Sequence, residues 1–439
     1  MAGSVIKGQA ITPFRRLTFG IILGYGLMML ALMTPATLLL TFKMIEIDPN
    51  GYTSSYGLVA GIGAFFALLG NPIGGAISDR TNISFGRRRT WILIGPLVGC
   101  AALLVVGFAS QTWQIILGWA VAQLFFNFGM ASYTALIPDQ VDSKRQGTLS
   151  GIMGLGIPAS IAIGMLLMNV MGDASTGVKW SVMAALGIVG PLISLFLIRD
   201  GKVDVVKKPQ TKASLSERIS KVYPSPRKYP HFTWAVALKF LMMMGYCSSL
   251  YLTVMLVNRM GLSESAATAS VATINIIAMI GTAITSVLGG IWSDKVGKQK
   301  PFLYVTVIVI AAGIFLYAFV PTMMSYTLAS LLIGIGYGCF SAVDMALVSR
   351  ILPNKEDAAK DFGIMNVANA LPQSIVPAIA PLLLGVGGWS FFYIALAVCT
   401  VLSVIALKPI PEVGQNPQVD GPKSTEASPI VGGSQHQAL

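Results

Sequence analysis

About twelve apolar segments, each roughly 20 residues long, follow one another through most of this 439-residue chain. Charged residues make up 11% of the sequence, whereas a soluble domain carries about a quarter. A backbone that lies in hydrocarbon must satisfy its hydrogen bonds within the chain, so we expect each segment to be a helix. The sequence therefore predicts an all-α, multi-pass membrane protein.

The apolar segments divide into two sets of six. We place the first six spans at 17–41, 57–77, 91–109, 113–137, 147–170 and 179–198, and the second six at 232–257, 265–292, 301–320, 323–349, 362–385 and 388–408. The sequence thus predicts an N-terminal tail at 1–16, six-helix bundles at 17–198 and 232–408, a central loop at 199–231 and a disordered tail at 409–439.

The basic residues are distributed unevenly between the loops. All Lys and Arg residues fall in one alternating set of loops and termini, except Lys43, Lys179 and Arg259 in the opposite set and Lys239 inside a span. Basic loops stay in the cytoplasm, so this pattern predicts that both termini are cytoplasmic. It also explains the net charge of +12 without a nucleic-acid partner.

One loop sequence occurs twice. Gly74–Arg89 reads GGAISDRTNISFGRRR, and Gly289–Lys300 reads GGIWSDKVGKQK, about half the chain later. A repeat on this scale indicates that one six-helix unit is used twice, which predicts two pseudo-symmetric halves with a solute site between them near the bilayer midplane. The aspartate of each copy is expected either to cap the next segment or to pair with a basic residue.

This repeated loop resembles the signature between helices 2 and 3, and between helices 8 and 9, of the major facilitator superfamily. The longer first copy, Leu32-Met33-Thr34-Pro35 and Gly70-Asn71-Pro72-Ile73 resemble the branch of sucrose–proton symporters and glycoside–pentoside–hexuronide symporters. The resemblance implies a conformational latch, with aspartates that pair with basic residues across the cytoplasmic face. Its residues would be Gly75, Asp79, Arg80, Gly86, Arg87, Arg88, Gly290, Asp294, Lys295, Gly297 and Lys298.

Two charged residues fall inside the spans. An ionised side chain at the centre of a membrane helix costs about 2.5–3.5 kcal/mol on insertion scales, so Lys239 and Asp344 are candidate coupling or gating residues. Counted from the cytoplasmic ends of their spans they reach similar depths, and we expect them to pair. The alternative is that Lys239 snorkels to the interface and Asp344 caps or pairs with a loop residue.

Polar side chains share faces of several spans at helical spacing. The candidate solute-binding residues are Tyr25, Trp119, Gln123, Asn127, Tyr246, Asn275, Tyr337, Ser341, Asn366, Asn369 and Gln373. Amides, hydroxyls and an indole suit an uncharged, polyhydroxylated ligand. The alternative is that they are hydrogen-bonding groups between helices, which are common in membrane bundles.

The sequence departs from the branch in its acidic residues. Sucrose–proton symporters carry an acid in helix 4, where this chain has Gln123 and Asn127, and cation-coupled relatives carry acids in helix 2, where no acid precedes Asp79. If protons are used, Asp344 is the carboxylate available within the spans. The resemblance still implies a secondary active transporter of a sugar or glycoside in the plasma membrane, coupled to protons or sodium. A uniporter, or an exporter of drugs or amphipathic metabolites, remains an alternative.

Other classes of function lack their residues. The two histidines, His231 and His436, lie outside the spans, and no phosphate-binding loop is present, so neither an enzyme nor an ATP-driven pump is expected. Cys100, Cys247, Cys339 and Cys399 lie in apolar runs without metal-site spacing. We expect no metal or cofactor, and a monomer in the lipid bilayer.

Overall fold

The computed structural model describes residues 12–172, 174–201, 226–227, 229–351 and 358–412. Most of the expected tails and of the expected central loop lie outside these residues. The described N-terminal half contains α1 (Phe14–Thr34), the π-helical turn η1 (Pro35–Leu39), α2 (Leu40–Ile47), α3 (Tyr52–Arg80), α4 (Arg87–Gly107), α5 (Thr112–Gln140), α6 (Ser143–Val170) and α7 (Thr176–Leu197). The C-terminal half contains α9 (Pro230–Tyr246), the 3₁₀ turn η2 (Cys247–Tyr251), α10 (Leu252–Met260), α11 (Glu264–Val296), α12 (Lys300–Phe319), α13 (Met323–Ile351) and α14 (Ala358–Leu407).

The helix count agrees with the expected twelve spans. Eleven stretches of the described chain are helical, long and apolar enough to cross a membrane. The last, Gly363–Leu407, has 45 residues, about twice the length needed for one crossing. Gly387 and Gly388 leave the helical range, with φ of −148° and +64°, so α14 consists of two helices that meet there. Divided at this point, the described chain contains twelve spans.

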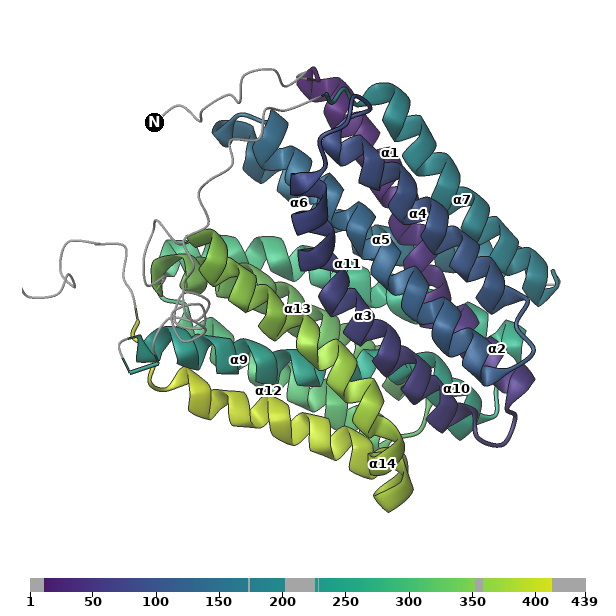
Figure 1. Cartoon of the computed structure of the whole chain (residues 1–439). Helices are drawn as coiled ribbons and strands as arrows, with labels where there is room; N and C mark the ends of the chain where they lie inside the picture. The colour runs from purple at the N-terminus through teal and green to yellow at the C-terminus, as the bar shows by residue number, and fades with distance from the viewer. Residues whose placement is uncertain (1–11, 173, 202–225, 228, 352–357, 413–439) are drawn as a thin grey trace, which may run out of the picture.

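The two halves lie side by side, with α3 packed on α14 and α6 packed on α11 (Figure 1). We call the end where α3 stops, α4 begins and α11 stops the motif end, and the opposite end the far end. The first and last described residues both lie at the motif end. Thr12 bonds there to Arg199, which follows α7, and Glu412 bonds to Lys300 at the start of α12.

Described side chains join the halves at the far end. Thr253 in α10 donates its hydroxyl to the carbonyl of Thr37 in η1, with an oxygen–oxygen distance of 2.6 Å. Tyr56 in α3 donates to the carbonyl of Leu250 in η2 at 3.2 Å.

Glycines in α3 allow the halves to approach closely. A Cβ atom on Gly57 would lie 2.8 Å from the Pro377 carbonyl oxygen of α14, and one on Gly61 would lie 3.2 Å from the Ala378 nitrogen. Helices in lipid associate through such close packing of small residues, because water supplies no hydrophobic drive between them. Gly57 and Gly61 are spaced by four, so both face α14.

We predict that Gly57→Ala destabilises the protein, because the added methyl group overlaps a backbone carbonyl that cannot rotate away. Overpacking of this kind costs about 1–3 kcal/mol. The matched control is Gly75→Ala in the same helix, where a Cβ would meet nothing within 4 Å. Since alanine favours a helix over glycine by about 1 kcal/mol, the control should leave the melting temperature unchanged or raise it. Thermal melting in detergent compares the two, and equal melting temperatures would contradict the close packing.

Candidate functional site

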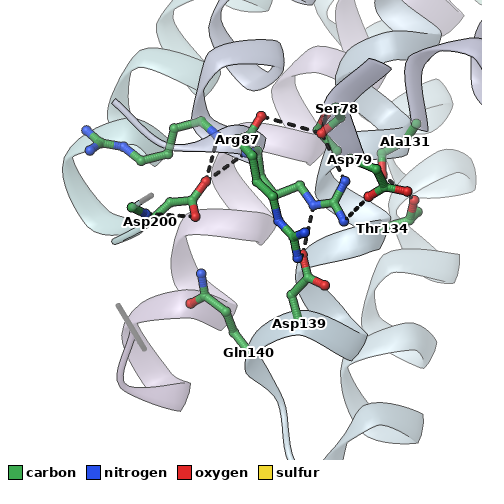
Figure 2. A network of polar contacts seen from close by, with 12 residues as sticks. Ser78, Asp79, Arg87, Ala131, Thr134, Asp139, Gln140 and Asp200 are labelled. Atoms are coloured by element: carbon green, nitrogen blue, oxygen red, sulfur yellow. Dashed lines mark hydrogen bonds and ion pairs between the residues drawn. The ribbon is translucent and has the colours of Figure 1, made fainter. Parts of the chain in front are cut away.

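Two buried arginines at the start of α4 converge on one carboxylate of α5 (Figure 2). Arg87 Nη2 and Arg88 Nε each lie 2.8 Å from Asp139 Oδ2. Arg88 also contacts α3, through Asp79 Oδ1 at 2.6 Å and Ser78 Oγ at 2.9 Å. The exposed fraction of the side chain is 12% for Asp139 and 60% for Asp79. Asp139 is therefore the acid that compensates the buried arginine charge, while Asp79 pairs from the surface.

Asp200, just past α7, ties the start of α4 to the same network (Figure 2). Its Oδ2 accepts hydrogen bonds from the backbone nitrogens of Arg88 at 2.7 Å and Arg89 at 3.3 Å. A carboxylate at this place satisfies free N–H groups and opposes the positive end of the helix dipole. Gly86 makes the approach possible, since its φ is +109° and a Cβ there would lie 2.7 Å from the Asp200 side chain.

The C-terminal half repeats this capping arrangement. Glu412 follows α14 as Asp200 follows α7, and its Oε1 accepts hydrogen bonds from the backbone nitrogens of Gln299 and Lys300 at the start of α12. The Lys300 ammonium group donates to the Lys408 carbonyl near the end of α14 at 3.0 Å. Asp139, Asp200 and Glu412 were not predicted as site residues. For Asp200 and Glu412, the available signal was an acid shortly after the last span of each half.

The two glycines of each pair in the repeated loop have different surroundings. A Cβ on Gly75 would meet nothing within 4 Å, and one on Gly290 would meet nothing nearer than 3.6 Å. A Cβ on Gly74 would instead lie 2.6 Å from α5, and one on Gly289 would lie 2.7 Å from α13. The first glycine of each pair therefore faces the neighbouring helix, and the second does not.

Asp79 has a basic partner, as expected for the repeated loop. The partner is Arg88 of the next helix in the same half, because the short α3–α4 turn brings the two together. Gly86 and Gly297 both have positive φ, as loop glycines that end or start a helix. Exposed basic members of the expected latch are Arg80, Lys295 and Lys298. The side chain of Asp294 lies outside the described part of the structure.

The two charged residues expected within the spans are brought together by the structure. Lys239 Nζ in α9 lies 2.8 Å from Asp344 Oδ2 in α13, and the side chains are 13% and 3% exposed. The other oxygen, Asp344 Oδ1, is buried and has no hydrogen-bond partner among the described residues. The pair is thus shielded from water, with one carboxylate oxygen free to take a proton or a further donor.

A stacked pair of tyrosines lies along the same seam between α9 and α13. The rings of Tyr246 and Tyr337 stack with their centroids 3.9 Å apart and their planes 19° apart. Each tyrosine is seven residues from its charged neighbour, and α9 and α13 run in opposite directions. Seven residues rise about 10 Å along a helix, so the stack forms a second layer about 10 Å beyond the ion pair.

The candidates in the N-terminal half pack within that half. Trp119 is 1% exposed, and a Cβ on Gly63 of α3 would lie 2.3 Å from its ring. Asn127 is 6% exposed and donates to the carbonyl of Gln123 in its own helix at 2.8 Å. Tyr25 is buried edge-to-face against another tyrosine of the half, with ring centroids 6.0 Å apart. In this conformation the shared face of α5 is a packing surface against α3.

The other candidates in the C-terminal half bond locally or lie at the surface. Asn275 donates to the carbonyl of Val271 and Ser341 to that of Gly338, each within one helix. Asn366 and Gln373 are exposed, and Asn369 is half-buried. The structure therefore joins Tyr246 with Tyr337 and Lys239 with Asp344 across helices, whereas the hydrogen bonds of Asn275 and Ser341 stay within their own helices.

An apolar cavity that sequence reasoning did not find lies between α9 and the first part of α14. Its volume is about 620 Å³, and its lining contains one polar side chain, a threonine. It is lined by Thr233, Val236, Ala237, Phe240, Leu241, Ile364, Val367, Ala368 and Leu371. The lining residues occupy the motif-end turns of both helices, on a side of α9 that does not include Lys239.

Comparison with known proteins gives one family and a set of solved structures of the same fold. The family model described as Major Facilitator Superfamily matches residues 17–359 and, in a second match, residues 276–434. Sugar transport protein 12 of Arabidopsis thaliana is 25% identical over 253 residues, which cover 50% of this chain and 48% of that protein. The chain thus spans about half the length of this relative.

Two solved structures show the same fold at low identity. A crystal structure of a D-xylose–proton symporter has a TM-score of 0.68 at 15% identity and covers 91% of this chain and 98% of its own. A crystal structure of a nucleoside transporter has a TM-score of 0.67 at 14% identity, with 89% and 99% covered. Likeness at this level shows the arrangement of helices and not the solute.

We predict that Asp139→Asn destabilises the protein far more than Asp79→Asn. The first change leaves two buried guanidinium groups without their shared anion, which costs about 3–5 kcal/mol. The second weakens an ion pair with one exposed partner, which is worth at most about 1 kcal/mol. Chemical or thermal unfolding in detergent measures both variants. Equal losses would contradict this assignment, because they would show that Asp79 holds the buried arginines as strongly as Asp139 does.

Proposed function

Because the chain belongs to the Major Facilitator Superfamily, we propose that it is a secondary active transporter that moves a small polar solute, a sugar or glycoside, across the plasma membrane by alternating access. The family and the fold are those of transporters and not of enzymes. The similarity to a sugar transport protein and to a D-xylose–proton symporter supports the solute class. We also propose that the protein acts as a monomer and needs no cofactor.

The orientation proposed for the chain follows from its basic residues. Arg80, Arg87, Lys295, Lys298 and Lys300 all lie at the motif end, and basic loops are retained in the cytoplasm. We assign the motif end to the cytoplasm, together with both termini. The halves are joined at the far end, so the described conformation is one in which access is from the cytoplasmic side.

The observation that carries the coupling proposal is the buried pair of Lys239 and Asp344. Protonation of Asp344, at the oxygen that has no partner among the described residues, would remove the anion that compensates Lys239. A buried cation left alone costs about 3–5 kcal/mol, so the seam between α9 and α13 would have to rearrange or admit water. Proton binding and a change of conformation are thereby linked, as coupled transport requires.

The stacked tyrosines extend this coupling site toward a solute. Tyr246 and Tyr337 lie one layer beyond the ion pair, and their rings and hydroxyl groups suit the faces and hydroxyls of a sugar. A rearrangement of the seam at Lys239 and Asp344 would move both rings. We propose that the solute binds beside this stack, with the exposed amides Asn366 and Gln373 as further contacts when the halves close on it.

The network of Arg87, Arg88 and Asp139 is proposed to act as a rigid support and not as a contact between halves. It binds α3, α4 and α5 to one another, and Asp200 adds the end of α7. If each half moves as one body, its helices must be joined to one another at the motif end, because the described side-chain contacts with the other half lie at the far end. The conformational latch expected for the repeated loop stays a prediction.

We predict that Asp344→Asn and Lys239→Gln each abolish solute accumulation in proteoliposomes under an inward proton gradient. The double variant should restore downhill flux without accumulation, because it removes both buried charges together. The assay uses labelled sucrose, maltose and a pentose. The control is Lys43→Gln, which breaks a local pair with Glu46 in α2 and should accumulate solute like the wild type. Accumulation by Asp344→Asn would exclude Asp344 as the coupling group, and downhill flux alone in the wild type would indicate a uniporter.

A second candidate function is favoured by the apolar cavity. A pocket of about 620 Å³ with almost no polar lining suits the apolar part of an amphipathic molecule better than a sugar. An exporter of amphipathic metabolites would use it directly. The position of the cavity, next to but separate from the ion pair, allows the two functions to be tested apart.

We predict that Ala368→Phe, which places a phenyl ring in the cavity and narrows it, leaves sugar flux unchanged. Ala368 is buried against the cavity, so the added ring would obstruct an amphipathic molecule there. Transport of a fluorescent amphipathic dye from loaded proteoliposomes, measured beside sugar uptake, checks this. If the wild type moves the dye but no sugar, and Ala368→Phe stops it, the exporter is the correct function.

A further inference from the structure

Irregular turns lie at matching places in the two halves, and each one accepts a hydrogen bond from the other half. η1 follows α1 in the first span, and η2 follows α9 in the seventh. Turns that depart from α-helical bonding place carbonyl oxygens where groups outside the helix can reach them. The Thr37 carbonyl of η1 takes the Thr253 hydroxyl, and the Leu250 carbonyl of η2 takes the Tyr56 hydroxyl.

An ion pair joins the same two halves at the same end. Lys179 Nζ, near the start of α7, lies 2.8 Å from Glu264 Oε1 at the start of α11. The exposed fraction is 6% for the lysine side chain and 46% for the glutamate. The ammonium group also donates to the Gly172 carbonyl at 3.2 Å. Lys179 is thus a nearly buried cation whose charge is compensated from the other half.

We infer that these contacts form a far-end latch that holds the outer side closed and that the Lys179–Glu264 ion pair sets its strength. The latch consists of the pairs Lys179–Glu264, Thr253–Thr37 and Tyr56–Leu250. The inference rests on the alternating access of the proposed function. The contact that sets the conformational state then lies at the far end, opposite to the repeated loop at the motif end. Opening this end separates the partners in all three pairs.

Because Lys179 is nearly buried, removing the charge of Glu264 and removing the charge of Lys179 should weaken the latch to different degrees. Glu264→Gln leaves a nearly buried ammonium group with one carbonyl, which penalises the closed state, because separation would let water reach the charge. Lys179→Gln removes the buried charge itself, and the glutamine can still donate to Gly172. Glu264→Gln should therefore open the far end more than Lys179→Gln, and the double variant should behave like Lys179→Gln.

The chain contains a matched control for this effect. Lys43 and Glu46 form an ion pair of 3.0 Å in α2, also at the far end, with side chains 3% and 51% exposed. Burial and distance resemble those of Lys179 and Glu264, but both partners belong to one half. Glu46→Gln leaves a buried lysine unpaired in the same way, and it breaks no contact between halves.

The test measures distances between spin labels in the purified full-length protein in nanodiscs, without solute. One label pair, on cysteines replacing Asn169 and Met324, reports on the far end, and a second pair, replacing Asn82 and Lys298, reports on the motif end. All four positions are exposed. The four native cysteines are first replaced by serine or alanine.

We expect Glu264→Gln to raise the ratio of far-end-open to far-end-closed molecules about tenfold, less than for a fully buried pair because Glu264 is half-exposed. The motif-end distance should shorten in the same molecules. Glu46→Gln should leave both distributions as in the wild type. Thr253→Val, which removes a hydroxyl group without changing the charge, should also raise the ratio of far-end-open to far-end-closed molecules. This variant takes the place of Glu264→Gln in the test if Glu264→Gln does not fold.

Two different failures can be told apart in this experiment. If the two distances change in opposite directions among the variants, but Glu264→Gln and Thr253→Val open the far end no more than Glu46→Gln, the latch is wrong and alternating access stands. If the two distances never change in opposite directions in any variant, alternating access itself is contradicted. A wrong solute class affects neither outcome, because no solute is present.

Discussion

A charge held away from water requires an opposite charge beside it, and this requirement determines how the described helices are tied together. Only 11% of the residues are charged, so each buried ion pair has a large local effect. Arg87 and Arg88 tie α4 to α5 through Asp139, and Arg88 ties α4 to α3 through Asp79. Lys239 and Asp344 join α9 to α13, and Lys179 reaches the other half. The three sets of ion pairs join different elements, and we propose a different role for each. The arginine network supports one half, the Lys239–Asp344 pair couples transport to a proton, and the Lys179–Glu264 pair belongs to the far-end latch.

The expected pairing of Lys239 and Asp344 was confirmed because depth along a membrane helix can be counted from the sequence. Each residue lies a few turns from an end marked by basic or proline residues, and a lone charge in a span must find its opposite. The twelve spans were predictable for the same reason, since length and hydropathy define them. Even the 50-residue helix α14 was expected as two spans, which its break at Gly387 and Gly388 confirms.

What could not be predicted was which neighbour each helix face meets. Helical spacing correctly places Trp119, Gln123 and Asn127 on one face of α5, but the sequence does not say that this face packs against Gly63 of α3. The same limit hid the partner of Arg87 and Arg88, because Asp139 ends a different helix. The apolar cavity between α9 and α14 was equally out of reach, since it depends on the distance between two helices.

In the proposed mechanism, solute movement is coupled to a proton through the seam of Lys239, Asp344 and the stacked tyrosines. The most direct test is proton movement itself, in proteoliposomes that hold a pH-sensitive dye and have no imposed gradient. We predict that adding the transported sugar outside acidifies the interior at a rate proportional to sugar entry. Sugar entry without any change in internal pH would contradict the claim.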